Sequence, residues 1–335
     1  MRRPSGRAPE WGRDPARRVG PGVPAPGGDV AAHGRAPPSH LGARPAVRRR
    51  PAGLAGLLDL APAGDGRFRA GPRSTVAGHA FGGAVAAQSL LAAGRTAPPG
   101  RIAHSLHGHF LRPGDVTAPT DLTVSTIRDG GSFSTRSVVA EQHGAAVFTL
   151  TASFQTPEDG WQHQLPELDA PAPEELPPLE EVAAAADGRV RQWLDWLAER
   201  HAFDFRFAGD LPRLAAERGE PAAPRQGFWL RSREPLPDEP LAQSCGVAYA
   251  SDMLLLGTSL APHATAVGAP GVAAASLDHA VWFHEPVRID QWLFFDQQSS
   301  WAGGGRTLCR GRLFDRAGRL VATVAQEGMI RRRPR

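Results

Sequence analysis

The sequence predicts an α+β fold in which an antiparallel sheet wraps around a long helix, and it predicts this unit twice. Three observations lead to this fold class. A run of small and apolar residues, 79–93, has the composition of a buried helix. Alternating segments separated by turn residues follow it, as in an antiparallel meander. The second half of the chain then repeats the first half in the same order.

The first helix and the strands after it have clear local signals. Residues 79–93 are entered through two glycines and are apolar on nearly every side, which predicts a central helix. Gly, Pro, Asp and His residues separate the segments that follow, as in hairpin turns. The alternating segments predicted to be strands are 101–112, 120–128, 132–142 and 146–155.

The second half of the chain aligns with the first half without gaps in three places. These are 246–252 with 82–88, 278–286 with 105–113, and 318–324 with 144–150. The first alignment sets Asp252 opposite Gln88. Two copies of one helix-plus-sheet unit explain the repeats. We expect the copies to pair into a single larger sheet with one site at their seam.

Composition shifts divide the chain into four parts. Residues 1–50 are rich in Arg, Pro and Gly without hydrophobic periodicity, so we expect a disordered tail. The first helix-plus-sheet unit is assigned to residues 51–157 and the second to 202–333. A Pro- and Glu-rich linker, 158–201, connects them and carries one predicted surface helix, from Glu180 to Glu199.

Charge and composition exclude several functions. All 38 basic residues among the 335 are Arg, so chemistry that requires Lys is excluded. The net charge of +4 is unevenly distributed, since residues 1–50 carry 11 Arg against three acidic residues, or +8. The rest of the chain therefore carries −4. A mildly acidic body argues against a nucleic-acid partner.

Cysteine content and hydropathy suggest where the protein works. Cys245 and Cys309 are too few for a disulfide framework, which favours a reducing compartment. No apolar run approaches the length of a membrane span, and the first residues lack the apolar core of a signal peptide. We therefore expect a cytoplasmic protein without a membrane partner.

The first catalytic candidate is Asp252. It is a single carboxylate within an apolar run, 249–256, whose spacing fits a buried helix. Burying an ionised carboxylate is costly unless it is hydrogen-bonded or takes part in chemistry. The alternative is a helix cap or a buried polar residue with satisfied hydrogen bonds, and this stretch alone does not decide between the two.

Histidines in the first repeat suggest a metal site, but strand geometry argues against it. His107 and His109 point to one side of the predicted strand and His104 to the other, so these three side chains do not converge. We expect no metal and no cofactor.

Two further motifs have weaker interpretations. Asp278-His279 and His284 resemble an acid/base pair, but no nucleophile motif accompanies them, which favours a structural role. The glycine-rich run at 303–306 lacks the lysine of a phosphate-binding loop and is predicted to be a turn or a loop near the ligand.

Several motifs in order resemble the acyl-CoA thioesterase II family, the TesB type, from about Phe68 to Arg331 with a gap at the linker. They are Phe81-Gly82-Gly83, His104 to Asp115, Arg128 to Arg136, Thr151 to Gln155, Tyr249 to Asp252, Leu277 to His284, and Gln326-Glu327-Gly328.

This resemblance implies a double hotdog: two antiparallel sheets, each wrapped around a long central helix. It also implies hydrolysis of fatty or related acyl-CoA to free acid and CoA, a place in lipid metabolism, and association into a homo-oligomer. The family's catalytic trio corresponds by motif to Asp252, Ser276 and Gln326. No covalent intermediate is required, because a thioester needs only an oriented, activated water.

Backbone N–H groups are the expected donors to the developing oxyanion. We place them at a helix start near Gly246 or at the Gly82-Gly83 turn, because a helix N-terminus favours negative charge. The expected substrate-binding residues are Gly82, Gly83, Gln88 and Gly246.

The sequence departs from the family pattern at three positions. Ser276 stands where Thr is common, Ala84 where Gln is expected and Glu285 where Arg is usual.

Two other functions remain open from the sequence alone. One is a hotdog hydratase or dehydratase, which would require a histidine at the site. The other is a non-catalytic acyl-CoA-binding module.

Overall fold

The computed structural model describes residues 53–74, 78–165 and 168–332, which all belong to one structural unit, Arg49–Arg335. The tail predicted to be disordered, residues 1–50, lies outside the described residues. Within the described residues, no helix is both long enough and apolar enough to cross a membrane.

Strands provide most of the regular structure. The helices are α1 (Leu54–Leu57), α2 (Gly82–Arg95), α3 (Leu179–Ala184), α4 (Gly188–Arg200), α5 (Pro212–Glu217) and α6 (Pro240–Ser251), with 3-10 turns η1 (Pro173–Glu175) and η2 (Leu255–His263). The strands are β1 (Leu60–Gly64), β2 (Arg67–Ala70), β3 (Ile102–Phe110), β4 (Thr120–Asp129), β5 (Phe133–Gln142), β6 (Ala145–Gln155), β7 (Phe203–Ala208), β8 (Arg225–Ser232), β9 (Val272–Ser276), β10 (Asp278–Phe283), β11 (Leu293–Gly303), β12 (Arg306–Phe314) and β13 (Leu320–Arg332).

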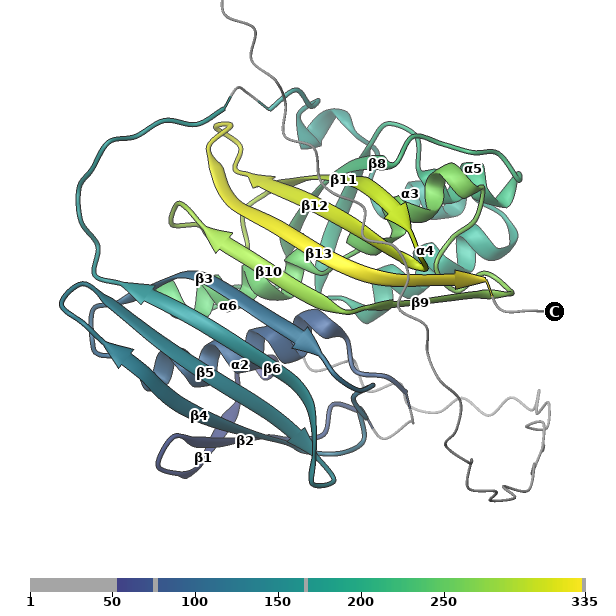
Figure 1. Cartoon of the computed structure of the whole chain (residues 1–335). Coiled ribbons are helices and arrows are strands. Elements are labelled where there is room, and N and C mark those ends of the chain that lie inside the picture. The colour runs from purple at the N-terminus through teal and green to yellow at the C-terminus, as the bar shows by residue number, and fades with distance from the viewer. Residues whose placement is uncertain (1–52, 75–77, 166–167, 333–335) are drawn as a thin grey trace, which may run out of the picture. The chain divides into compact units, whose positions relative to one another are not determined.

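The strands form one antiparallel sheet whose two halves have the same internal order. The first half runs β1-β2-β4-β5-β6-β3, and the second half, read from the far edge, runs β7-β8-β11-β12-β13-β10. Strands β3 and β10 pair with each other and join the halves (Figure 1). The structure therefore repeats one six-strand unit, as the sequence repeats predicted. Strand β9 lies off this path and pairs with β13.

Two helices lie against the joined sheet and contact each other. Helix α2 packs on β3, β4, β5 and β6, and helix α6 packs on β3 and β10. Figure 1 shows both behind the sheet. The fully buried positions of α2 are mostly Gly, Ala and Ser, which allow a close approach of helix to strand. The predicted apolar helix of residues 79–93 is thus present, shifted a few residues toward the C-terminus.

The linker differs from its prediction. It contains two helices, α3 and α4, instead of one continuous helix from Glu180 to Glu199. The break falls at residues 185–187, where Asp187 is extended, and α4 then begins at Gly188, whose φ of +55° is left-handed. Leu197 of α4 is buried, whereas Trp196 is 45% exposed.

Candidate active site

Asp252 lies immediately after the C-terminus of α6 and not inside a helix. The helix ends at Ser251, and Leu254 then adopts φ +62° before η2 begins. Because a left-handed residue interrupts α-helical geometry, the predicted helical run 249–256 is wrong beyond Ser251. The carboxylate therefore lies at the end of α6, where the chain turns.

The Asp252 carboxylate faces the start of helix α2. Its Oδ2 accepts a hydrogen bond from the backbone N–H of Gly83, 2.8 Å away. Gly83 is the second residue of α2, so this N–H has no partner within its own helix. The positive end of the α2 dipole also favours a negative charge there. The chain thus sets a carboxylate from the end of one helix against the N-terminus of the other.

Gln326 of β13 contacts the second carboxylate oxygen. Its Nε2 lies 2.5 Å from Oδ1 of Asp252. Gln326 is buried and Asp252 is half-buried. Burial raises the pKa of Asp252 to about 6, although the hydrogen bonds from Gln326 and Gly83 act in the opposite direction. A carboxylate with a pKa near 6 can accept a proton at neutral pH and release it readily.

Hydrogen-bond rules fix the orientation of the Gln326 amide. An ionised Asp252 only accepts, so Gln326 presents its NH₂ group, and Nε2 also lies 3.3 Å from Nδ1 of His279. Burial lowers the pKa of His279 to about 4, which keeps its ring neutral. Nδ1 then accepts, and the protonated Nε2 donates to Ser251 Oγ at 2.7 Å. Ser251 donates in turn to the carbonyl of Ala248 at 3.0 Å.

This arrangement leaves one polar atom unpaired. The Oε1 of Gln326 is buried and has no hydrogen-bond partner among the described residues. Buried amide oxygens normally have a partner, so an unpaired one beside a carboxylate marks a place where a small polar molecule can be held.

Ser276 reaches the same region from another direction. It ends β9, and β9 pairs with β13 so that Ser276 lies opposite Gly328, two residues beyond Gln326. Across the described part of the chain, no hydrogen bond joins its hydroxyl to Asp252 or Gln326. The structure therefore brings Asp252 and Gln326 into contact and puts Ser276 on the strand next to Gln326.

Gly82 and Gly83 allow the start of α2 to approach Asp252. A Cβ on Gly82 would lie 2.7 Å from Oδ2 of Asp252. A Cβ on Gly83 would lie 2.3 Å from the backbone oxygen of Tyr249. Any larger residue would push the two helix ends apart, which explains on steric grounds why both positions are glycine.

Gln88 and Gly246 lie away from the carboxylate contacts. Gln88 is buried in the middle of α2, and its Nε2 donates to the carbonyl of Leu57 at 3.3 Å. The expected helix start near Gly246 is wrong, because α6 begins at Pro240 and Gly246 is an interior residue. An interior N–H is used within the helix and is not available as an oxyanion donor.

The polar set occurs in one repeat only. Continuing the repeat alignment, the counterparts of Asp252, Ser276 and Gln326 are Gln88, Ala103 and Ala152. The strand pairing supports this alignment, since Ala280 pairs with Ala325 as His107 pairs with Thr151. The first repeat therefore has no counterpart to the carboxylate of Asp252, the hydroxyl of Ser276 or the amide of Gln326.

A surface cavity of about 710 Å³ lies at the opposite end of α6. Ala103, Pro240 and Phe283 are among its lining residues, and neither Asp252 nor Gln326 is. Ala103, the repeat counterpart of Ser276, lines this cavity together with Ile102 of the first repeat, while most of the other lining residues belong to the second repeat.

The sequence analysis did not select Ser251, and it expected a structural role for His279. The buried hydrogen bonds of His279 to Ser251 and Gln326 are consistent with such a role. The available signal was position, because Ser251 directly precedes Asp252 and His279 lies close to Ser276 in sequence.

Comparisons with known proteins agree with this architecture. Residues 69–155 match the acyl-CoA thioesterase N-terminal domain, and residues 168–330 match the acyl-CoA thioesterase C-terminal domain. The chain is 36% identical to human acyl-coenzyme A thioesterase 8, over 83% of this chain and 88% of that protein.

Two solved structures are similar as well. The acyl-CoA thioesterase II TesB2 of Mycobacterium marinum is 40% identical, with a TM-score of 0.67 over 83% of this chain and 97% of that chain. A hot dog fold protein from Alicyclobacillus acidocaldarius, 20% identical, has a TM-score of 0.65 over 83% of this chain and 97% of its own. The latter shows the fold alone.

The fold and the domain matches define a hotdog-fold thioesterase. The chain belongs to the acyl-CoA thioesterase II family. It is a thioester hydrolase that acts on acyl-CoA. Of the three functions left open by the sequence, hydrolysis is therefore the one that the comparisons support, rather than a hydratase or dehydratase or a non-catalytic binding module.

Replacing Gly83 with alanine tests the close approach of the two helix ends. The new Cβ would meet the Tyr249 carbonyl at 2.3 Å, so the start of α2 must move away from Asp252. We expect a loss of stability of about 1–3 kcal/mol from overpacking, and lower turnover as well. Gly131→Ala is the matched control, because a Cβ there meets nothing within 4 Å. Equal melting temperatures and equal thiol release for the two variants would contradict the steric argument.

Proposed function

We propose that this enzyme hydrolyses acyl-CoA by direct attack of a water molecule that Asp252 activates, with Gln326 and Ser276 positioning that water. The observation that carries the proposal is the half-buried carboxylate of Asp252, which accepts hydrogen bonds from the N–H of Gly83 and the amide of Gln326 and has its pKa raised to about 6. A base of this pKa suits proton abstraction near neutral pH.

The carboxylate can accept a further hydrogen bond from a water molecule without losing either existing one. Each carboxylate oxygen has two lone pairs, and each accepts one bond from the protein here. A water that donates one hydrogen to Asp252 can donate the other to the unpaired Oε1 of Gln326. The hydroxyl of Ser276, on the adjacent strand, is the third group that would orient it.

The start of α2 is the proposed oxyanion site. The N–H of Gly83 is already used by Asp252, which leaves the N–H of Gly82. In the described part of the chain this first helical N–H donates to no other group. Attack on the thioester carbonyl creates negative charge on oxygen, and a helix N-terminus with a free donor stabilises that charge. Collapse of the tetrahedral intermediate then releases CoA as the thiol and leaves the free acid.

The orientation of His279 argues against a role as the general base. Both of its ring nitrogens are hydrogen-bonded, to Gln326 and to Ser251, and the ring is fully buried. A hydratase or dehydratase would require a histidine with a free nitrogen directed at the substrate. We propose that His279 instead fixes the amide of Gln326.

The proposed architecture is a double hotdog with α2 and α6 as the central helices. We assign the first hotdog to residues 51–157, the linker to 158–201 and the second hotdog to 202–333. The same internal strand order in both halves supports this division. Fatty or related acyl-CoA substrates, lipid metabolism and a cytoplasmic location also belong to the proposal.

We further propose a homo-oligomer, because strands β1 and β7 leave the two edges of the sheet unpaired within the described chain. Light scattering at micromolar concentration tests it. A monomer at every concentration would contradict it.

Asp252→Asn tests the base directly. Asparagine keeps the size and can still accept one of the two hydrogen bonds, but it cannot take a proton from water, so we expect turnover to fall by about a hundredfold or more. Thiol release from acyl-CoAs of increasing chain length, followed with a thiol-reactive dye, measures this loss. Asp195→Asn, an exposed carboxylate on α4, is the control. Turnover near the wild-type value in Asp252→Asn would mean that another group activates the water.

The pKa of Asp252 predicts opposite effects of pH on turnover and on stability. Turnover should rise as pH increases through about 6, where the carboxylate ionises. The folded pKa lies above the ordinary value of 3.8, so the fold favours the protonated form. Ionisation therefore costs stability as pH rises from about 4 through 6, by up to about 3 kcal/mol.

Two measurements check this prediction: turnover from pH 4.5 to 9, and melting temperatures of wild type and Asp252→Asn over the same range. The variant should be the more stable protein at pH 8, with a smaller difference at pH 5. A turnover profile that is flat between pH 5 and 8 would exclude Asp252 as the titrating base.

A further inference from the structure

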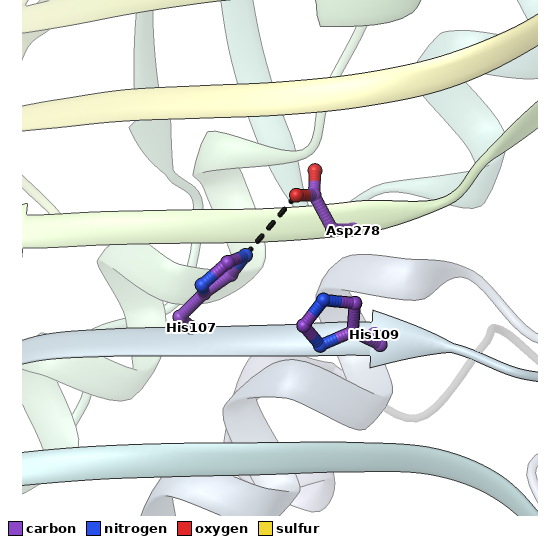
Figure 2. Close-up of side chains that lie close together, drawn as sticks. All are labelled: His107, His109 and Asp278. Atoms are coloured by element: carbon purple, nitrogen blue, oxygen red, sulfur yellow. Dashed lines mark hydrogen bonds and ion pairs between the residues drawn. The ribbon is translucent and has the colours of Figure 1, made fainter.

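Three side chains with metal-binding atoms gather on the exposed face of the seam between β3 and β10. His107 and His109 come from β3, and Asp278 is the first residue of β10 (Figure 2). Their ligand atoms all lie within 4.8 Å of one another. We propose that these three residues bind one Zn²⁺ ion.

Strand register explains why these residues meet. Asp278 pairs directly with His109, and His107 lies two residues along β3 on the same face. Gly108, between the two histidines, and Leu106, just before His107, are buried, so these alternate positions of β3 face the protein interior. The seam therefore collects two donors from the first repeat and one from the second.

The sequence analysis expected no metal because it considered histidines of one strand only. His104 does stay apart from the group, as predicted, since its Nε2 lies 2.8 Å from Oγ of Ser153. The third donor comes from a segment far along the chain, and pairing across the seam brings it into place.

Two imidazoles and one carboxylate form a donor set that suits Zn²⁺, with a fourth position for water. Nε2 of His107 lies 3.1 Å from Oδ2 of Asp278. Two ligands bound to one tetrahedral ion at about 2.1 Å are separated by roughly 3.4 Å, so this pair is already close to bound geometry. Two ligands of one ion can be at most about 4.2 Å apart, so the most distant donor must move inward. The exposed rings have space to turn.

A backbone contact holds the carboxylate in position. Oδ1 of Asp278 accepts a hydrogen bond from the N–H of Glu327 at 2.6 Å, which leaves Oδ2 directed at His107. Such outer contacts orient metal ligands and contribute to affinity. The side chains of His107 and Asp278 are 49% and 27% exposed, so an ion can reach them from solvent.

The location gives the ion a structural role. It would connect β3 to β10, the pair of strands that joins the two halves of the sheet. Any ligand that binds the folded state and not the unfolded state raises the melting temperature. We therefore infer that Zn²⁺ stabilises the seam, without entering the hydrolytic reaction.

The test is a Zn²⁺ titration of the untagged full chain, first stripped with a chelator, in competition with a chromophoric zinc indicator. We expect one ion per wild-type chain and a rise in melting temperature. His109→Ala should weaken binding at least about tenfold, because loss of an outer contact alone costs that much in known sites. His109→Ala should also abolish the thermal shift. His143→Ala is the control, since His143 is also an exposed histidine near a carboxylate, Asp115, at 3.6 Å.

Circular dichroism and acyl-CoA hydrolysis without metal establish that each variant is folded, and they keep this test separate from that of the hydrolytic mechanism. No Zn²⁺ binding by the wild type would overturn the proposal, and so would equal affinity and an equal thermal shift in wild type and His109→Ala. Ca²⁺ binding as tight as Zn²⁺ binding would also overturn it, because Ca²⁺ prefers oxygen ligands and the proposed set contains two nitrogens.

Discussion

The contact between the Asp252 carboxylate and the N-terminus of α2 is the interaction on which the rest of the site depends. It requires that one helix end and the other begin at the same place, and the two helices meet this requirement at Ser251 and Gly82. It also requires glycine at the start of α2, where a Cβ would collide with the carboxylate or with the Tyr249 carbonyl. The antiparallel sheet supports this meeting point by holding Gln326 of β13 against the same carboxylate. The helix ends, the glycines and the sheet thus all contribute to the position of one carboxylate, that of Asp252.

Burial of that acid has an energetic consequence. Enclosing Asp252 raises its pKa and works against its ionised form, while the Gly83 N–H and the Gln326 amide partly offset the cost. The offset depends on the orientation of the amide, which His279 and Ser251 fix through a directed set of hydrogen bonds. Each member of this set is buried and uses its polar atoms, except Oε1 of Gln326. Stability is given up at the residue that the proposed mechanism uses as its proton acceptor, and such a cost is common at functional sites.

The repeated architecture explains why such a site forms once in each chain. Both halves have the same strand order, yet the counterparts of the three polar residues in the first repeat are Gln88, Ala103 and Ala152. The helices have diverged as well, since α2 continues seven residues past Gln88 whereas α6 stops before Asp252. The backbone pairing of the two repeats is symmetric at the seam, whereas their polar side chains differ. The same seam brings His107, His109 and Asp278 together on its exposed face.

The sequence by itself determined the α+β class, the two repeats and the positions of most strands, because periodicity and turn residues act over a few neighbours. It also singled out Asp252 as a carboxylate in an apolar run. Family motifs added Gln326 and Ser276. Tertiary structure decided what those residues contact. Asp252 meets Gly83 and Gln326 across 169 and 74 positions of the chain, distances over which no local pattern carries information. The end of α6 at Ser251, the interior place of Gly246 and the break between α3 and α4 follow from backbone conformations and helix ends that packing selects. Sequence specifies which side chains are available, and packing alone specifies which of them touch.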